Sequence, residues 1–132
     1  MFSTSNSTRQ PLTQLEQLIM DYVWAHPGCT AEVCREGVAV KRALKDSTIR
    51  TVLRNLEDKG YINHTLDGRT FVYRPVDTKR SVAVEAAVNL IERFCEGSVE
   101  ELLVGLVDNQ VLKPHQLQRL AAEIAKRKGK RT

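Results

Sequence analysis

The chain has 132 residues, of which 42% are hydrophobic and 27% charged, a composition typical of a globular protein and not of a disordered one. Its 20 basic and 16 acidic residues give a net charge of +4, which is only a weak sign of a polyanionic partner. No run of about 18 apolar residues occurs, so we expect no membrane span. Three unevenly spaced cysteines do not make a disulfide framework and favour a reducing cytoplasm. The polar segment 1–11 lacks an apolar signal core and is expected to be a flexible arm.

Two short helices are expected after the arm. Thr13 and Glu16 have the spacing of a capping box at the start of a helix over residues 13–26. Apolar residues recur through that segment at helical intervals, which supports the assignment. A second, shorter helix is capped by Thr30 and ends at Gly37, a residue type typical of helix stops.

A third helix is predicted from Asp46, which is placed to cap it, to Gly60 at the C′ position. An apolar stripe at i, i+3, i+4 and i+7 consists of Ile49, Val52, Leu53 and Leu56. With that stripe buried, a rotation of 100° per residue turns Ser47, Thr51 and Arg54 outward. Thr48, Arg50 and Asn55 flank that outward face. Hydroxyl, amide and guanidinium groups are the groups that contact base edges and phosphates.

A β-hairpin is predicted next. The β-rich runs YINHT and TFVYR flank LDGR, whose Asp67-Gly68 pair is a strong hairpin-turn signal, and Pro75 ends the second strand. Between Arg35 and Arg54 there are six basic residues and two acidic ones. Three helices, a hairpin and this clustered charge predict a winged helix-turn-helix over residues 12–76.

These features predict which residues bind DNA. Base readout is expected from four residues of the third helix: Arg50, Thr51, Arg54 and Asn55. Backbone contacts are expected from the same helix, its start and the wing: Lys45, Ser47, Thr48, His64, Arg69 and Arg74.

A helical dimerisation domain is expected over residues 77–128, followed by a basic tail at 129–132. Gly97 is expected to end its first helix, Ser98 with Glu101 makes a second capping box, and Pro114 opens the last helix. Its apolar positions include Val84, Val88, Ile91, Phe94, Leu102, Leu103, Leu106, Leu117, Leu120 and Ile124. Three short helices cannot bury this surface among themselves, so we expect a homodimer. The fold class is therefore mainly α with a small β-hairpin wing.

Other kinds of site find less support. His26, Cys29 and Cys34 lie within nine residues, but their spacing fits no standard zinc pattern, and we expect no metal and no cofactor. Cys95 lies on an apolar stripe and is expected to be a small buried hydrophobe. Neither a Gly-rich phosphate loop nor a His-Glu-x-x-His motif is present, which argues against an enzyme. Two alternatives to a simple DNA-binding repressor stay open: a winged-helix protein-interaction module, and a repressor with a cysteine-based redox or metal switch.

The segment STIRTVLRNLEDKGYINHTLDGRTFVYRP resembles the recognition helix and wing of the penicillinase-repressor family (BlaI/MecI type). The resemblance extends from LTQLEQLIMDYVW into the C-terminal helices. It implies a homodimeric repressor on a palindromic operator that controls β-lactamase or other stress genes, with a membrane metalloprotease-sensor as a partner that cleaves the dimerisation segment. The family's cleaved bond, often Asn-Phe, would fall within LLVGLV, where this chain carries Gly105-Leu106. Copper-responsive relatives carry paired Cys-x-Cys ligands, whereas this C-terminal tail has no cysteine.

Overall fold

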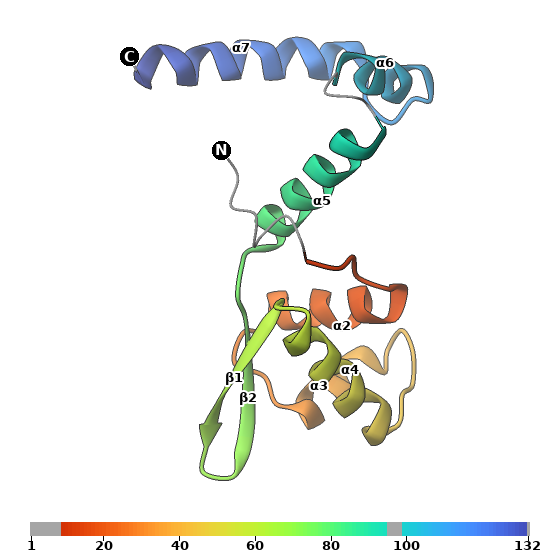
Figure 1. Ribbon diagram of the computed structural model, residues 1–132, viewed down its shortest axis with the longest axis vertical. Coiled ribbons are helices and arrows are strands. Elements are labelled where there is room, and N and C mark those ends of the chain that lie inside the picture. The colour runs from red at the N-terminus through yellow and green to blue at the C-terminus, as the bar shows by residue number, and fades with distance from the viewer. Residues whose placement is uncertain (1–8, 95–98, 132) are drawn as a thin grey trace. The chain divides into compact units, whose positions relative to one another are not determined.

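The computed structural model describes residues 9–94 and 99–131. The chain forms two compact units, Met1–Val88 and Asn89–Thr132. The first unit contains α2 (Gln14–Ala25), α3 (Ala31–Val38), α4 (Asp46–Asp58), β1 (Ile62–Asp67) and β2 (Thr70–Pro75). The three helices pack against one another, and the antiparallel hairpin lies beside them (Figure 1). This mainly helical arrangement with a two-stranded wing confirms the predicted fold class.

The first unit has one aliphatic core. All four residues of the α4 stripe are buried, and α2 contributes Ile19, Met20 and Val23. Tyr61, Ile62 and Tyr73 close the core from the hairpin. The helical spacing of the apolar residues in α4 therefore gives the helix one buried face and one exposed face.

The predicted capping box at the start of α2 is present. The Thr13 hydroxyl accepts a hydrogen bond from the Glu16 amide at 3.2 Å, and the Glu16 carboxylate accepts one from the Thr13 amide at 2.9 Å. The same carboxylate is buried and binds Lys59 Nζ at 2.7 Å, so the cap also ties α2 to the end of α4.

The prediction that Gly37 stops α3 is wrong, because the helix runs through it to Val38. Gly37 is needed for packing instead: a Cβ there would lie 2.0 Å from Cε1 of Tyr22 on α2. The predicted start of α3 is confirmed, since the Thr30 hydroxyl accepts a hydrogen bond from the Val33 amide at 3.2 Å.

The two ends of α4 differ in how well the sequence predicts them. Lys45 is the N-cap residue and makes no side-chain capping bond, so the prediction that Asp46 caps the helix is wrong. Asp46 is the first helical residue, and its carboxylate binds Arg50 one turn later. Gly60 follows the C-cap with a φ of +87°, which confirms its predicted C′ position.

The hairpin register places the turn one residue later than the sequence suggests. Asp67 pairs with Thr70, so the two turn residues are Gly68 and Arg69, and Gly68 has a φ of +63°. Pro75 is the last residue of β2, as predicted. The β2 strand is also joined to the start of α3, because the Tyr73 amide donates to the Cys29 carbonyl at 2.8 Å.

Helix α5 (Lys79–Phe94) begins in the first unit and ends in the second, which also contains α6 (Glu100–Asp108) and α7 (Pro114–Arg131). Pro114 opens α7 as predicted, and the helical backbone continues through the basic residues to Arg131. The predicted features at Cys95, Gly97 and Ser98 lie outside the described residues. Within the two described ranges, no helix is both long and apolar enough to cross a lipid bilayer.

The predicted arm is only partly covered by the structure, because residues 1–8 lie outside the described part. Arg9, Gln10 and Pro11 are held against the first unit, in contrast to the expected flexible arm. The Gln10 carbonyl accepts a hydrogen bond from the Tyr61 hydroxyl at 2.5 Å, and the Pro11 carbonyl accepts one from Lys59 Nζ at 3.1 Å.

Candidate nucleic-acid interface

The outward face of α4 carries the polar residues that the helical rotation places there. Ser47, Thr51 and Arg54 are exposed along this face. Arg50 and Asn55 beside them are also exposed, and Thr48 is half-buried. The buried apolar stripe on the opposite side of α4 fixes the rotation of the helix about its axis. All of these polar side chains therefore project from the same helix in a fixed direction.

Arg50 is already engaged in the free protein. Its Nε donates to the Asp46 carboxylate at 2.9 Å, and both side chains are exposed. The hydrogen bond and the charge of Asp46 raise the pKa of Arg50, whose guanidinium stays cationic throughout. An exposed pair between residues four apart is weak, so a phosphate or a base edge can compete with Asp46 for the guanidinium.

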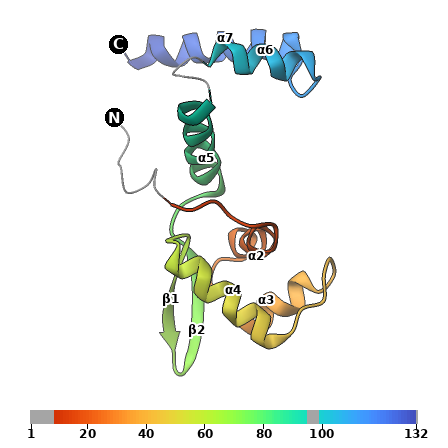
Figure 2. The same cartoon turned by 45° about the vertical axis from the view of Figure 1, so that its right-hand side comes forward.

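A groove of about 590 Å³ lies between α4 and the wing. Arg50 and Arg54 of α4 and Arg69 of the hairpin turn line it, so three guanidinium groups converge there. The last turn of α4 lies beside the start of β1, and from there the helix and the hairpin diverge (Figure 2). Acidic side chains of Glu32, Glu57 and Asp58 line the same groove, and the last two belong to the C-terminal turn of α4.

His64 is held inside this groove. Its Nδ1–H donates to the Glu57 carboxylate at 2.8 Å. Its ring lies flat on Phe71, with centroids 3.9 Å apart and an angle of 5° between the planes. His64 therefore connects the last turn of α4 with both strands of the wing, a role that its sequence position does not reveal.

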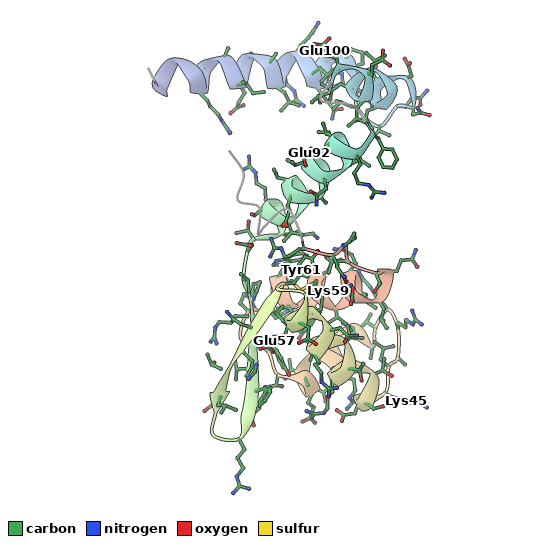
Figure 3. All side chains as sticks on the ribbon, in the orientation of Figure 1. Lys45, Glu57, Lys59, Tyr61, Glu92 and Glu100 are labelled. Atoms are coloured by element: carbon green, nitrogen blue, oxygen red, sulfur yellow. The ribbon has the colours of Figure 1, made fainter. Side chains whose placement is uncertain are left out.

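The other predicted backbone contacts are accessible. Arg69 is exposed at the hairpin turn, and Arg74 is exposed on β2, where it lies 3.4 Å from the Thr65 hydroxyl. Lys45 is exposed at the start of α4, and Figure 3 labels it together with Glu57 near the other end of that helix. The structure thus brings Arg69 into the α4 groove and leaves Lys45 and Arg74 outside it.

Sequence reasoning missed several residues that line the groove. Thr30, Ala31 and Glu32 come from the start of α3, and Phe71 and Tyr73 from β2. The period-two spacing of the two aromatic residues could have placed them on one face of the strand. Nothing in the sequence signals that the start of α3 reaches the groove.

The two buried cysteines form a local packing contact. Cys29 is at N′ and Cys34 at N4 of α3, the two positions of a hydrophobic staple, and both are buried. A hydrogen bond from the Cys34 thiol lowers the pKa of Cys29, whereas that bond and burial raise the pKa of Cys34. The exposed His26 stacks on Tyr22 at 4.2 Å. Across the described ranges, no group of three or more metal-ligating side chains is present.

A helix with an exposed polar face, packed in a three-helix unit beside a basic wing, defines a winged-helix transcription regulator. The sequence model of the penicillinase repressor family matches residues 12–126, and the chain belongs to this family. It is a family of transcriptional repressors and not of enzymes, as the sequence predicted.

Known proteins agree with this assignment. The penicillinase repressor of Bacillus licheniformis is 26% identical over 122 residues, which cover 91% of this chain and 94% of that protein. The methicillin resistance regulatory protein MecI of Staphylococcus aureus strain N315 is 21% identical, over 83% of this chain and 89% of that protein.

Two solved structures are similar in fold. The DNA-binding domain of the repressor BlaI has a TM-score of 0.51 and 26% identity, and the match covers 56% of this chain and 90% of that chain. A MarR family transcription regulator, SP03579, has a TM-score of 0.50 and 20% identity over 92% of this chain and 79% of that chain. The second likeness extends over nearly the whole chain and concerns the fold alone.

Proposed function

We propose that the chain is a homodimeric, sequence-specific repressor that binds a palindromic operator. Each protomer inserts α4 into the major groove and lays its wing on the neighbouring phosphate backbone. Two recognition helices then enter successive major grooves about 34 Å apart, and the bound dimer blocks transcription by occupying the site.

The observation that carries this proposal is the division of α4 into two faces. Ile49, Val52, Leu53 and Leu56 are all buried, and the exposed side chains of the helix carry hydroxyl, amide and guanidinium groups, with carboxylates only at its two ends and no apolar group among them. The arginines at positions 50 and 54 face the same groove as Arg69 of the wing. A helix that only completed a core would not need this combination of groups.

Each polar residue has a proposed role. Arg54 and Arg50 read guanine through paired donors, Asn55 reads adenine, and Thr51 contacts a thymine methyl group. Positioning on phosphates falls to Lys45, Ser47, Thr48, Arg69 and Arg74. His64 was also predicted to contact the backbone, but its bond to Glu57 supports a role in holding the wing.

A second copy of the chain would cover the apolar surface of α5, α6 and α7. In the part of these helices that the structure describes, no side chain is fully buried. The predicted dimerisation residues Val84, Phe94, Leu120 and Ile124 are exposed. The remaining ones are half-buried: Val88, Ile91, Leu102, Leu103, Leu106 and Leu117. A dimer interface is the economical way to remove this surface from water.

The names of the relatives suggest what is regulated. We propose that the operator controls β-lactamase or other stress-response genes in the cytoplasm, where such a repressor meets its DNA. We also propose a membrane metalloprotease-sensor as the partner that would end repression. Its target region contains Gly105-Leu106 within α6, so cleavage there requires this helix to unwind locally.

Selection from a random duplex library, followed by titration of the selected and a scrambled duplex at two salt concentrations, tests the proposal. We expect the selected duplex to be palindromic and to bind at least about 1,000-fold more tightly than the scrambled one. Both affinities should fall steeply with salt, because phosphate contacts release counterions. A chain that binds neither duplex at about 50 mM salt would instead be a winged-helix module for an acidic protein partner.

A further inference from the structure

Arg9 is a largely buried arginine that lies outside the proposed DNA-binding surface. It stands five residues before α2, and its side chain is only 9% exposed. Its guanidinium lies over the ring of Tyr61, with Cζ 5.0 Å from the ring centroid. Burying a guanidinium group is costly unless its charge is paired. The partners of Arg9 therefore show which segments of the chain it connects.

Those partners come from three separate parts of the first unit. Nη1 donates to the Gly60 carbonyl at 3.0 Å, directly after α4. Nη2 binds the Asp77 carboxylate at 2.9 Å, in the short segment between β2 and α5. Nε donates to both carboxylate oxygens of Glu85 on α5, at 3.2 and 3.1 Å, and Nη2 also binds Glu85. Arg9 therefore connects the end of the recognition helix with the second turn of α5.

The beginning of α5 depends on polar contacts of this kind. No side chain of α5 is fully buried, and among the described residues of this helix only Val82 packs against the core of the first unit. The indole N–H of Trp24 donates to the Asp77 carbonyl at 2.9 Å, and Lys79 pairs with Asp21 at 3.2 Å. Lys79 and Asp21 are considerably more exposed than Arg9 and Glu85, whose side chain is 12% exposed. Arg9–Glu85 is thus the most buried ion pair that reaches the body of α5.

The residues next to Arg9 in the chain are also bound to the end of α4. Lys59 and Tyr61, where α4 passes into the hairpin, bind the backbone of the same arm segment through the Pro11 and Gln10 carbonyls (Figure 3). The arm from Arg9 to Pro11 is therefore fixed to the end of α4 on one side and to α5 on the other. A change in the direction of α5 would have to break the contacts of Arg9 first.

We propose that Arg9 is a positioning residue that fixes the direction in which α5 leaves the winged helix, and thereby selects the spacing between the two operator half-sites. The inference rests on the proposed dimeric function, because α5 leads into the helices that a second copy would cover. A rigid connection allows both recognition helices to bind at one half-site spacing only. A loose connection allows them to bind at several spacings.

Paired half-sites with graded spacing test this inference. The half-site comes from duplexes selected by the wild-type chain, and the panel places two copies at centre-to-centre distances that change by one base pair. Affinity for a single half-site and thermal stability are measured in parallel. Arg9→Gln removes the charge and the forked geometry, and Arg80→Gln removes an equal charge from an exposed arginine at the start of α5.

The wild type and Arg80→Gln should prefer one spacing, whereas Arg9→Gln should lose roughly ten-fold or more of that preference. Single half-site affinity should stay within about two-fold of the wild-type value, because Arg9 does not line the α4 groove. Arg9→Lys, which keeps the charge without the fork, should restore part of the preference. If Arg9→Gln does not fold, the double variant Arg9→Met/Glu85→Met removes both charges together and should show the same loss of preference.

Two contrary results can be told apart. A folded Arg9 variant that keeps the full spacing preference would overturn the role of Arg9 and leave the dimeric repressor intact. A wild-type chain that binds paired and single half-sites equally well would overturn the dimeric function, and the inference with it.

Discussion

The Glu57 carboxylate accepts a hydrogen bond from Nδ1–H of His64 at 2.8 Å and so joins the last turn of α4 to the first strand of the wing. The stacking of His64 on Phe71 extends this connection to the second strand. Helix α4 and the wing are therefore held together by His64, which pairs with a carboxylate on the helix and stacks on a ring of the wing.

This pairing predicts different effects of two wing substitutions. His64→Ala should weaken operator binding with little change in its salt dependence, because it loosens the wing without removing a side chain that contacts phosphate. Arg69→Ala should weaken binding to all duplexes and reduce the salt slope by about one. Titrations of each variant at four salt concentrations give both slopes. A reduced slope for His64→Ala would return this residue to the set of backbone contacts.

Arg54 should read a base directly. Arg54→Ala is expected to cost roughly 1–3 kcal/mol on the operator and to relax specificity at one position. Arg54→Lys keeps the charge but not the paired donors, so it should lose the same discrimination while its binding to scrambled DNA stays close to wild type. The measurement is a competition titration against operators with single base-pair changes. Equal losses on operator and scrambled duplex would show that Arg54 contacts phosphate.

Glu16 should make the stability of the first unit depend on pH. Burial raises the pKa of Glu16, but the hydrogen bonds from Lys59 and from the Thr13 backbone outweigh it and hold the pKa below its ordinary value. The unfolded chain therefore binds this proton at a higher pH than the folded chain does. The stabilisation is complete at pH values above the ordinary glutamate pKa of about 4.3, which applies to the unfolded chain. It is lost as the pH falls through the lower pKa of the folded chain.

Glu16→Gln should accordingly lower the free energy of unfolding at pH 7 by about 1–2 kcal/mol and flatten its decline below about pH 5. Urea denaturation between pH 3 and 7 measures both effects. Glu36→Gln, at an exposed position on α3, is the matched control and should leave the profile unchanged. An identical acid profile for wild type and Glu16→Gln would show that other carboxylates control the acid transition.

The sequence predicts most reliably what depends on near neighbours in the chain. The Thr13–Glu16 capping box, the four-residue stripe of α4 and the C′ position of Gly60 each involve residues within a few turns, and all are confirmed. Exposure of the polar α4 face follows from that stripe by geometry alone.

Contacts between distant segments could not be predicted in this way. Arg9 and Glu85 are 76 residues apart, and their pairing depends on how α5 leaves the hairpin. Glu57 and His64 are only seven residues apart, but they meet because the chain reverses at Gly60. Aspartate is a residue type that often caps helices, and yet Asp46 is the first helical residue. The N-cap position, with its extended backbone, belongs to Lys45.

Gly37 provides the sharpest test of tertiary packing. A Cβ at this position would lie 2.0 Å from Cε1 and 2.5 Å from Cζ of Tyr22, whose ring is stacked on His26. Gly37→Ala should therefore destabilise the protein by roughly 1–3 kcal/mol, since the ring must leave its place between α2 and α3. In a Tyr22→Ala background the obstacle is absent, and the same substitution should be neutral or stabilising by up to about 1 kcal/mol through helix propensity. Urea denaturation of the four proteins completes the double-mutant cycle, and additive effects of the two substitutions would show that the Tyr22 ring does not restrict this site.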